Sequence, residues 1–325
     1  MTGPIRLGIL AWPQYTDWPA LLEVGRRVDE LGYDALWTWD HPYPIRGDER
    51  GPSFEGYLTL AGWAGVTKGA TLGHMVTANP LRNPAMLVKI VTTLDHMSDG
   101  RAVLGIGAGW NVAEFEAFGV DIGRSMGERL DWLDEAVALA RAMLDGEEPA
   151  ATGGHYRNRQ VRNEPRPIQP RLPILIGGKG KRKTLRTVAR YADMWATFGD
   201  LDVVSEAADT LRRWCDEVRR HPSEIRWVFS AEASVLRDNE AEARRVAAEI
   251  GRHNGGWEGP GQAWTPEHLA EKLAPYVEMG FREIYLDMPA PYDDETLTRF
   301  IGEVGPLLEG DRAARQAQPG GNSPA

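Results

Sequence analysis

A carboxylate and an imidazole stand side by side where an apolar run of this sequence ends. The run 35–39 stops at Asp40 and His41, and Pro42 follows. Histidine suits proton exchange near neutral pH, because the pKa of an unperturbed imidazole lies near 6.5. We therefore take Asp40 and His41 as candidates for proton transfer. The plainer interpretation is that Asp40 caps a turn and His41 fills space beside the proline.

Two glycine-rich stretches also follow apolar runs. The first, "GIGAGWN" at 105–111, has the spacing G-x-G-x-G and not the G-x-G-x-x-G of a dinucleotide-binding turn. Its glycines would let the backbone approach a flat ring closely, unless they form a plain turn. The second, "ILIGGKGKRKTL" at 174–185, leads from a strand into a helix start, where N–H groups and the helix dipole favour an anion. It lacks the Walker pattern, and the alternative is a solvated basic helix start.

Other kinds of site and partner find little support. The seven histidines lack the spacing of a metal site, the single Cys215 excludes an internal disulfide, and no G-x-S-x-G motif is present. The net charge of −10 argues against nucleic-acid binding. No apolar run reaches the roughly 20 residues of a membrane span, and the N-terminus has no signal-peptide pattern. We expect a cytoplasmic protein without a metal, nucleic-acid or membrane partner.

Eight strand-then-helix units must position these residues. The apolar, β-rich runs that we interpret as strands are 5–12, 34–39, 70–77, 101–107, 172–178, 193–198, 226–236 and 282–288. Eight such units over about 300 residues predict a (β/α)8 TIM barrel, and a doubly wound open sheet is the alternative. The Gly-, Pro- and Arg-rich segment 146–171 predicts an insertion between the fourth and fifth βα units. We expect one domain, 1–310, and a disordered tail, 311–325.

In a TIM barrel the carboxyl ends of the strands form the active-site face. Asp40 and His41 end the second strand, and the two glycine-rich stretches end the fourth and fifth. Tryptophans also gather near strand ends, and some of them could wall a pocket for an aromatic ligand. This convergence favours a functional site over a set of isolated turns.

Four segments together resemble the luciferase-like monooxygenase superfamily, and more narrowly its branch that uses the deazaflavin coenzyme F420. They are "GYDALWTWDH", the stretch from "LGHMVTANPLRNPAML" through "GIGAGWNVAEFEAFG", "GERLDWLDEA" and "PILIGGKGKRKTLRTVARYADMW". The resemblance is strong over residues 5 to about 200. It implies a flavin-type ring over the carboxyl ends of the barrel strands.

The resemblance also implies roles for individual residues. Asp40 and His41 match the family's pair beside the deazaflavin ring, and His74 and Met75 match a strand bulge with a non-prolyl cis peptide bond. The positions that match the lining of the cofactor ring are Thr77, Asn79, Gly107, Gly109 and Trp110. The positions that match the phosphate-binding turn are Gly177, Gly178, Lys179, Gly180 and Thr184.

Two departures from the family pattern bear on function. Lysines enter the phosphate turn, which would suit the acidic tail of F420 and favours it over FMN. Trp110 stands where the sugar-phosphate dehydrogenases of the family have a glutamate, so a sugar-phosphate substrate is in doubt, and Glu114 is a nearby acid or base. We therefore expect hydride transfer between F420 and an unidentified small organic substrate. An FMN-dependent monooxygenase and a non-catalytic flavin-binding protein are the alternatives, and a homodimer stays open.

Overall fold

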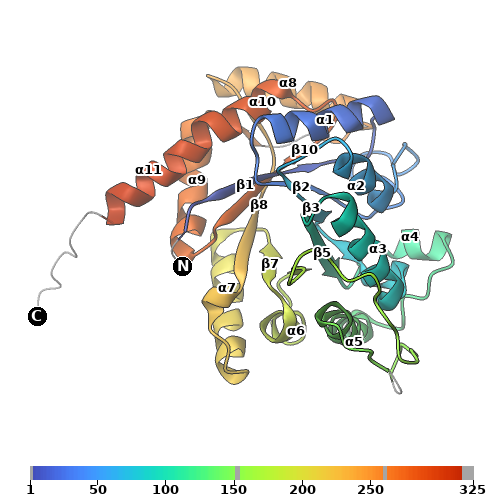
Figure 1. Ribbon diagram of the computed structural model, residues 1–325. Coiled ribbons are helices and arrows are strands. Elements are labelled where there is room, and N and C mark those ends of the chain that lie inside the picture. The colour runs from blue at the N-terminus through green and yellow to red at the C-terminus, as the bar shows by residue number, and fades with distance from the viewer. Residues whose placement is uncertain (1–2, 151–153, 259–261, 317–325) are drawn as a thin grey trace, which may run out of the picture.

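Eight parallel strands close into a barrel in the computed structural model, which describes residues 3–150, 154–258 and 262–316 (Figure 1). Neighbouring strands follow the order β10-β1-β2-β3-β5-β6-β7-β8, and β10 pairs again with β8. Every pairing in this ring is parallel. The predicted (β/α)8 barrel is confirmed, and the open doubly wound sheet is excluded.

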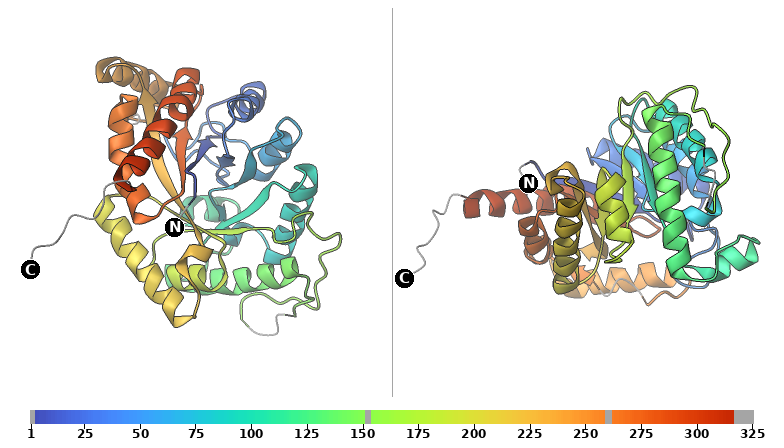
Figure 2. Two further views of the ribbon diagram at one scale, coloured as in Figure 1. Left: turned by 60° about the vertical axis from the view of Figure 1, so that its left-hand side comes forward. Right: turned by 90° about the horizontal axis from the view of Figure 1, so that it is seen from below.

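The barrel strands are β1 (Arg6–Ala11), β2 (Ala35–Thr38), β3 (Thr71–His74), β5 (Ala102–Gly107), β6 (Ile174–Gly177), β7 (Met194–Thr197), β8 (Arg226–Leu236) and β10 (Glu283–Met288). The short strand β4 (Thr77–Ala78) pairs with β5, and β9 (Gln262–Trp264) pairs in parallel with the end of β8. The helices are α1 (Trp18–Glu30), α2 (Gly56–Ala64), α3 (Pro84–Met97), α4 (Val112–Ala117), α5 (Met126–Asp145), α6 (Thr184–Tyr191), α7 (Leu201–Glu217), α8 (Glu240–His253), α9 (Pro266–Met279), α10 (Asp294–Arg299) and α11 (Gly305–Gln316). The helices surround the strands, as the two views of Figure 2 show.

Side-chain alternation along the strands separates two cores. Outward residues such as Ile9, Leu36 and Leu72 pack against the helices. Inward residues such as Leu10 and Trp37 fill the barrel with side chains from its other strands. The barrel interior is therefore a packed core, and a ligand has to bind above it, at the carboxyl ends of the strands.

Sequence signals set several helix starts. The Asp17 side chain accepts a hydrogen bond from the Ala20 N–H at 2.8 Å at the start of α1, and Asn83 caps α3 from immediately before Pro84. A proline at the first turn costs nothing there, because its missing N–H has no intrahelical partner to lose. These caps fix where α1 and α3 begin, and hence where the loops before them meet the barrel.

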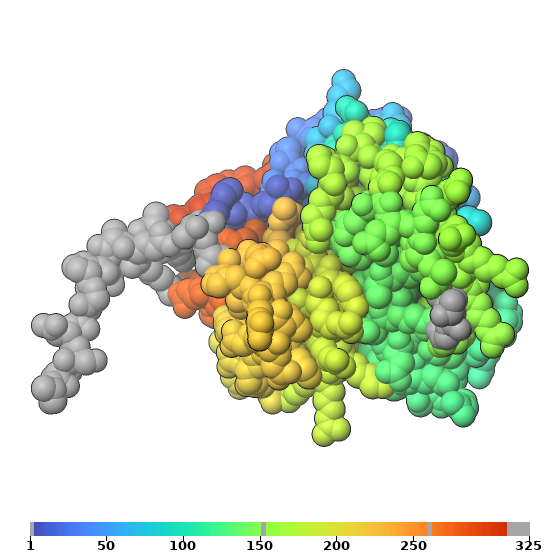
Figure 3. All heavy atoms as spheres, turned by 60° about the horizontal axis from the view of Figure 1, so that its bottom comes forward, coloured from blue at the N-terminus to red at the C-terminus, as the bar shows by residue number. Residues whose placement is uncertain are grey.

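The segment between α5 and β6, where an insertion was expected, forms no helix or strand over its described residues 146–150 and 154–173. It lies on the outer surface beside α5, light green next to green in Figure 3. The His155 ring stacks on Trp132 of α5 with 3.6 Å between ring centroids, and Glu135 accepts hydrogen bonds from two backbone N–H groups of the segment. The segment is thus held against a helix and leaves the barrel closed.

The C-terminal quarter is more elaborate than the sequence pattern indicated. Helix α9, with Pro275 in its interior, follows β9 and was not among the expected elements. Helix α11 continues to Gln316, into the segment expected to be a tail, and residues 317–325 lie outside the described part of the chain. None of the described helices combines the length and apolar character needed to cross a membrane.

Candidate active site

The imidazole of His41 and the carboxylate of Glu114 meet above the carboxyl ends of β2 and β5. His41 Nδ1 lies 2.7 Å from Glu114 Oε2, and Glu114 Oε1 accepts the N–H of Tyr43 at 3.1 Å. The Glu114 side chain is 2% exposed and that of His41 is 11% exposed. Two residues 73 positions apart, both expected from the sequence to do acid–base chemistry, therefore form one pair.

Helix α4 positions Glu114 in this pair. Its six residues follow Gly109, which has a φ of +78° and whose missing side chain leaves room for the ring of Phe115. Trp110 lies just before α4, 57% exposed, with its ring centroid 5.5 Å from that of His41. Gly109 and Trp110, two expected cofactor residues, thus lie beside the His41–Glu114 pair.

Asp40 belongs to a different network. Its carboxylate accepts two hydrogen bonds from the guanidinium of Arg82, at 2.5 and 3.1 Å, and one from the Thr77 hydroxyl. Arg82 also donates to Glu55 at 2.6 Å and lies over the Tyr57 ring at 4.8 Å. The sequence left open whether Asp40 orients the imidazole of His41, and in the described residues Glu114 fills that place.

The environment of Asp40 keeps it charged. Burial alone would raise the pKa of this carboxyl, but the charges of His74 and Arg82, with hydrogen bonds from Arg82 and Thr77, outweigh burial and hold the pKa below its ordinary value. Asp40 is thus an anion with its charge already matched. Such a group is better suited to fix the end of β2 than to exchange a proton.

A non-prolyl cis peptide bond joins Met75 to Val76 at the end of β3. A side chain at Gly107 or Gly177 would meet the Val76 side chain at 2.7 and 3.0 Å, and one at Gly105 would meet the backbone oxygen of His74. From the sequence, we interpreted the glycines of β5 as positions where the backbone can approach a flat ligand ring closely. In the structure these glycines also make room for the backbone of His74 and the side chain of Val76, at and after the end of β3.

Two of the expected cofactor residues are fully buried. His74, 1% exposed, packs edge-on against Tyr57 of α2 with 4.2 Å between ring centroids, on the outer side of the barrel wall. Burial lowers its pKa more than the nearby Asp40 raises it. Asn79, also 1% exposed, lies beside Tyr156 of the α5–β6 segment; burial raises the pKa of Tyr156 to about 12, with a smaller opposing effect from Asn79.

The turn after β6 has the geometry of an anion site. Gly178 has a φ of +121°, and a side chain at Gly180 would meet the Thr184 hydroxyl at 2.6 Å. The Gly178 N–H donates to Ala196, but the N–H groups of residues 179–182 have no acceptor among the described residues. Free N–H groups at a helix start can hold a phosphate, so this turn fits the phosphate of a flavin-type cofactor.

The lysines of this turn differ in what they contact. Lys181 pairs with Glu206 and Lys183 with Asp131, so much of the expected positive charge is matched within the protein. Lys179 instead donates to the backbone oxygen of Phe198 at 3.0 Å and lies over its ring. Of these three, Lys179 alone forms no ion pair with the described residues.

Buried polar atoms without partners also gather at the carboxyl ends of the strands. The Thr38 hydroxyl, the Trp39 Nε1 and the Thr197 hydroxyl have no hydrogen-bond partner among the described residues. Buried polar groups are normally satisfied, so these three atoms are available to a polar ligand at the carboxyl ends of the strands, although other unpaired atoms, such as Trp227 Nε1, lie elsewhere. Together with the open N–H groups of the β6 turn, they fit a ring-and-phosphate cofactor.

Sequence reasoning missed two participants at this face, Arg82 and Asp287. Asp287 is the penultimate residue of β10 and follows the inward-facing Tyr285 by two positions, so it also faces inward, above the packed core. The sequence pattern that identified Asp40 could also have identified Asp287, because Asp287 is an acidic residue near the end of the apolar run "EIYLDM".

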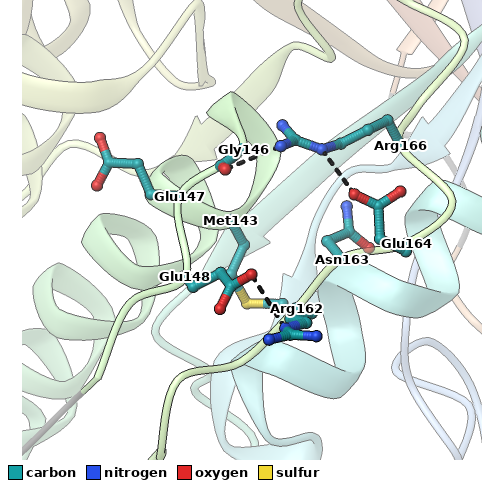
Figure 4. Close-up of a pocket in the computed structure, with 8 residues that line it drawn as sticks. All are labelled: Met143, Gly146, Glu147, Glu148, Arg162, Asn163, Glu164 and Arg166. Carbon is teal, nitrogen blue, oxygen red and sulfur yellow. Dashed lines mark hydrogen bonds and ion pairs between the residues drawn. The ribbon is translucent and has the colours of Figure 1, made fainter.

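A small cavity lies elsewhere, between the C-terminal end of α5 and the segment that follows it (Figure 4). Its volume is about 20 Å³, enough for roughly one water molecule. The charged groups around it pair with one another, Arg162 with Glu148 and Arg166 with Glu164. This cavity is structural. In the described residues no cluster of His, Cys, Asp or Glu side chains could hold a metal ion.

Comparisons with known proteins agree with this geometry. The family model described as luciferase-like monooxygenase matches residues 6–263. An uncharacterized protein of Mycobacterium tuberculosis is 34% identical over 187 residues, covering 53% of this chain and 65% of its own length, which is less than two thirds of that relative.

Two further matches span nearly the whole chain. An F420-dependent glucose-6-phosphate dehydrogenase of Microbacterium testaceum is 26% identical over 333 residues, covering 93% of this chain and 97% of that protein. Among solved structures, an F420-dependent secondary alcohol dehydrogenase in complex with an F420-acetone adduct superposes with a TM-score of 0.80 at 18% identity. That match covers 94% of this chain and 99% of the other, and it supports the fold.

Proposed function

Because the chain belongs to the luciferase-like monooxygenase family, we propose that it is an oxidoreductase that moves a hydride between coenzyme F420 and a small organic substrate. The dehydrogenase of Microbacterium testaceum, similar along nearly its whole length, is named as F420-dependent. The single observation that carries the proposal is the His41–Glu114 pair at the carboxyl ends of the strands.

Specific residues of this face would hold the cofactor. The N–H groups after Gly178 and the Thr184 hydroxyl would bind its phosphate, and Val76, beside Gly107 and Gly177, would support its ring. When bound, the deazaflavin supplies the centre that accepts or gives the hydride. Trp110, His41 and the orphan donor Trp39 Nε1 are the side chains expected nearest to that ring.

His41 would manage the proton that balances the hydride. Glu114 accepts from the imidazole at Nδ1, which assigns the Nδ1–H tautomer and leaves Nε2 to bind or release a proton. The Nε2 atom has no hydrogen-bond partner among the described residues. Glu114 in turn is fixed by the N–H of Tyr43, so the carboxylate orients the imidazole.

The role of Asp40 under this proposal is to hold the loop that carries His41. Its pairing with Arg82 ties the end of β2 to the turn before α3, one residue before the imidazole. A residue that fixes a reacting side chain contributes through geometry, since small displacements of reacting groups cost much of the rate. We therefore propose Asp40 as a positioning residue.

Calorimetry tests which cofactor the protein binds. The purified protein is titrated separately with F420 and with FMN. We expect stoichiometric binding of F420 and weaker binding of FMN. The pairing of Lys181 and Lys183 removes part of the charge argument for F420, so this measurement decides between the two cofactors. Tight FMN binding without F420 binding would replace the proposal with the FMN-dependent monooxygenase.

Turnover separates an enzyme from a flavin-binding protein on the same barrel. The protein loaded with oxidised F420 is incubated with small alcohols and aldehydes, the protein loaded with reduced F420 is incubated with aldehydes and ketones, and the absorbance of the cofactor is followed. Change of the cofactor's redox state with any member supports the enzyme. We also propose the cytoplasmic location that we expected from the sequence. Light scattering tests whether the chain forms a homodimer.

A further inference from the structure

Asp287 faces the top of the barrel from the strand opposite the glycine-rich side. Above the packed core, β5 and β6 contribute Gly107 and Gly177, while β10 contributes Asp287. Asp287 is partly exposed although its strand neighbours are buried, so a small molecule at the carboxyl ends of the strands can reach it. None of the roles assigned above uses this carboxyl.

A bulge in β8 places a hydroxyl beside the Asp287 carboxyl. Tyr285 pairs with Ser230, but Asp287 pairs with Ala233, so β8 carries an extra residue there. Glu232 occupies the bulge with a φ of +55°, and its N–H donates to the Ser230 hydroxyl at 3.2 Å. That hydroxyl lies 3.4 Å from Asp287 Oδ1. Bulges at barrel rims commonly redirect side chains beside active sites.

Asp287 lacks the cation that matches Asp40. No lysine or arginine forms an ion pair with it among the described residues, and the charged groups near it are Arg46 and Glu232. Burial, with Glu232 adding to it, raises the pKa of Asp287 to about 6 despite Trp12, Arg46 and Ser230. The carboxyl therefore keeps its proton to a higher pH than an ordinary aspartate does, and its protonated form can donate a hydrogen bond.

A row of aromatic rings links this carboxyl to the proton-transfer pair. Ring centroids are 5.5 Å apart between Trp110 and His41, 6.3 Å between His41 and Trp39, 4.8 Å between Trp39 and Trp12, and 4.8 Å between Trp12 and Trp257. Trp39 Nε1 is a buried donor without a partner among the described residues. Trp110 lies at the exposed end of this row, whereas Trp12 is fully buried and Trp39 nearly so, so the row forms a packed apolar floor beneath the carboxyl ends of the strands.

We propose that Asp287 and Ser230 bind a hydroxyl or carbonyl oxygen of a flat, uncharged substrate that lies over this floor, against the exposed Trp110. The proposal rests on the function proposed above and names its substrate class. The oxygen bound by Asp287 is remote from the carbon that reacts near His41, so the carboxyl orients the substrate. A substrate with a negative charge at that end is disfavoured by Asp287 and Glu232.

Three probes of one shape test this specificity. 2-Naphthol carries a hydroxyl, naphthalene lacks it and 2-naphthoate carries a charge in its place. Calorimetry at pH 6 measures the binding of each to the protein with and without F420. We expect 2-naphthol to bind about tenfold more tightly than naphthalene, and 2-naphthoate more weakly than 2-naphthol, because a well-placed buried hydrogen bond contributes about that much.

Variants assign the preference to the carboxyl. Asp287→Leu should bind 2-naphthol and naphthalene equally, Ser230→Ala should lose part of the preference, and Asp287→Asn, which can still donate and accept, should keep most of it. Glu283→Gln is the matched control, because Glu283 is a buried carboxylate at the other end of β10, paired with Arg6 and Arg226. It should leave the preference unchanged.

The outcomes separate this inference from the function it rests on. Unchanged F420 affinity in Asp287→Leu, with a lost preference for 2-naphthol, supports the inference. An intact preference in the folded Asp287→Leu and Ser230→Ala proteins overturns it, as does a wild-type protein that fails to prefer 2-naphthol. Absence of F420 binding to the wild type overturns the proposed function instead, and the probe series on the cofactor-free protein still decides the role of Asp287.

Discussion

Asp40 and Glu114 are both buried carboxylates at the carboxyl end of the barrel, and they differ in what they hold. Asp40 contacts the guanidinium of Arg82, which keeps its charge at any pH at which the protein is folded. Glu114 contacts the imidazole of His41, and imidazole is a type of group that can exchange a proton in catalysis. The first pair is suited only to fix geometry, whereas the second contains the group that we propose to exchange a proton during the reaction.

The largest effect is expected when the imidazole is removed. His41→Asn keeps a polar side chain but loses the nitrogen that we propose to exchange the proton. Turnover should fall by roughly 10²–10⁴-fold, because general acid–base catalysis contributes about that factor. F420 affinity, measured in parallel by calorimetry, should change far less. Near-normal turnover in this variant would show that the His41–Glu114 pair, like the Asp40–Arg82 pair, does not transfer a proton.

Breaking the fixed pair should act on stability. Asp40→Asn leaves Arg82 without its nearest anion. Loss of one partner of a buried ion pair lowers the free energy of unfolding by about 3–5 kcal/mol. We expect a loss of about 3 kcal/mol, because Arg82 keeps its ion pair with Glu55. Urea unfolding measures the change. Asp209→Asn is the control, because Asp209 pairs with Arg212 at the surface, and its unfolding midpoint should not move.

The same variant should change how stability depends on pH. The pKa of Asp40 is lower in the folded protein than in the unfolded chain, so its charge stabilises the fold above the unfolded-state pKa, near 4. That stabilisation is lost as the pH falls through the folded-state pKa. Urea midpoints between pH 3 and 7 should therefore fall more steeply for the wild type than for Asp40→Asn. Parallel curves would mean that Asp40 is not held ionised.

A smaller loss of activity is expected when the orienting carboxylate is neutralised. Glu114→Gln keeps the shape of the side chain but removes its negative charge, and the amide can accept only one of the two hydrogen bonds that the carboxylate accepts from His41 and Tyr43. Such bonds contribute about 1.5–3 kcal/mol, so turnover should fall by roughly 10- to 100-fold. Urea unfolding should differ little from the wild type. A stability loss as large as that of Asp40→Asn, with normal turnover, would show that both carboxylates are structural.

The smallest effect is expected in the turn after β6, where a lysine without an ion pair among the described residues can be compared with a paired one. Lys179→Gln should weaken F420 binding about two- to fivefold at low salt, and the difference should shrink at 0.5 M salt, where exposed charges are screened. Lys181→Gln removes a lysine whose charge is already matched by Glu206, so its effect should be smaller. Equal effects of the two changes would indicate that only net charge matters.

The sequence predicted the barrel well because its strands carry a local signal. Apolar runs such as 101–107 and 226–236 are readable without knowledge of their neighbours, and Asn83–Pro84 marks a helix start on its own. Helix α9 was missed. Its interior Pro275 is a residue that normally ends a helix, so the local pattern argued against it.

The candidate site was less predictable because its contacts are long-range. His41, Glu114 and Asp40 were each identifiable from their positions, but which carboxylate contacts the imidazole depends on how the loops after β2 and β5 meet. The bulge at Glu232 gave no sign either, since a positive φ at a non-glycine residue is imposed by tertiary packing. Sequence could nominate the residues of this face but not connect them.

The shortness of α4 gives the His41–Glu114 contact a further consequence. Six residues are too few for a helix that is stable by itself, so α4 depends on what its side chains reach. The hydrogen bond to His41 and the order of α4 are therefore linked, and weakening either should weaken the other. Amide hydrogen exchange in α4 should accelerate in His41→Asn, so that the protection of a few backbone groups reports on a side chain from another loop.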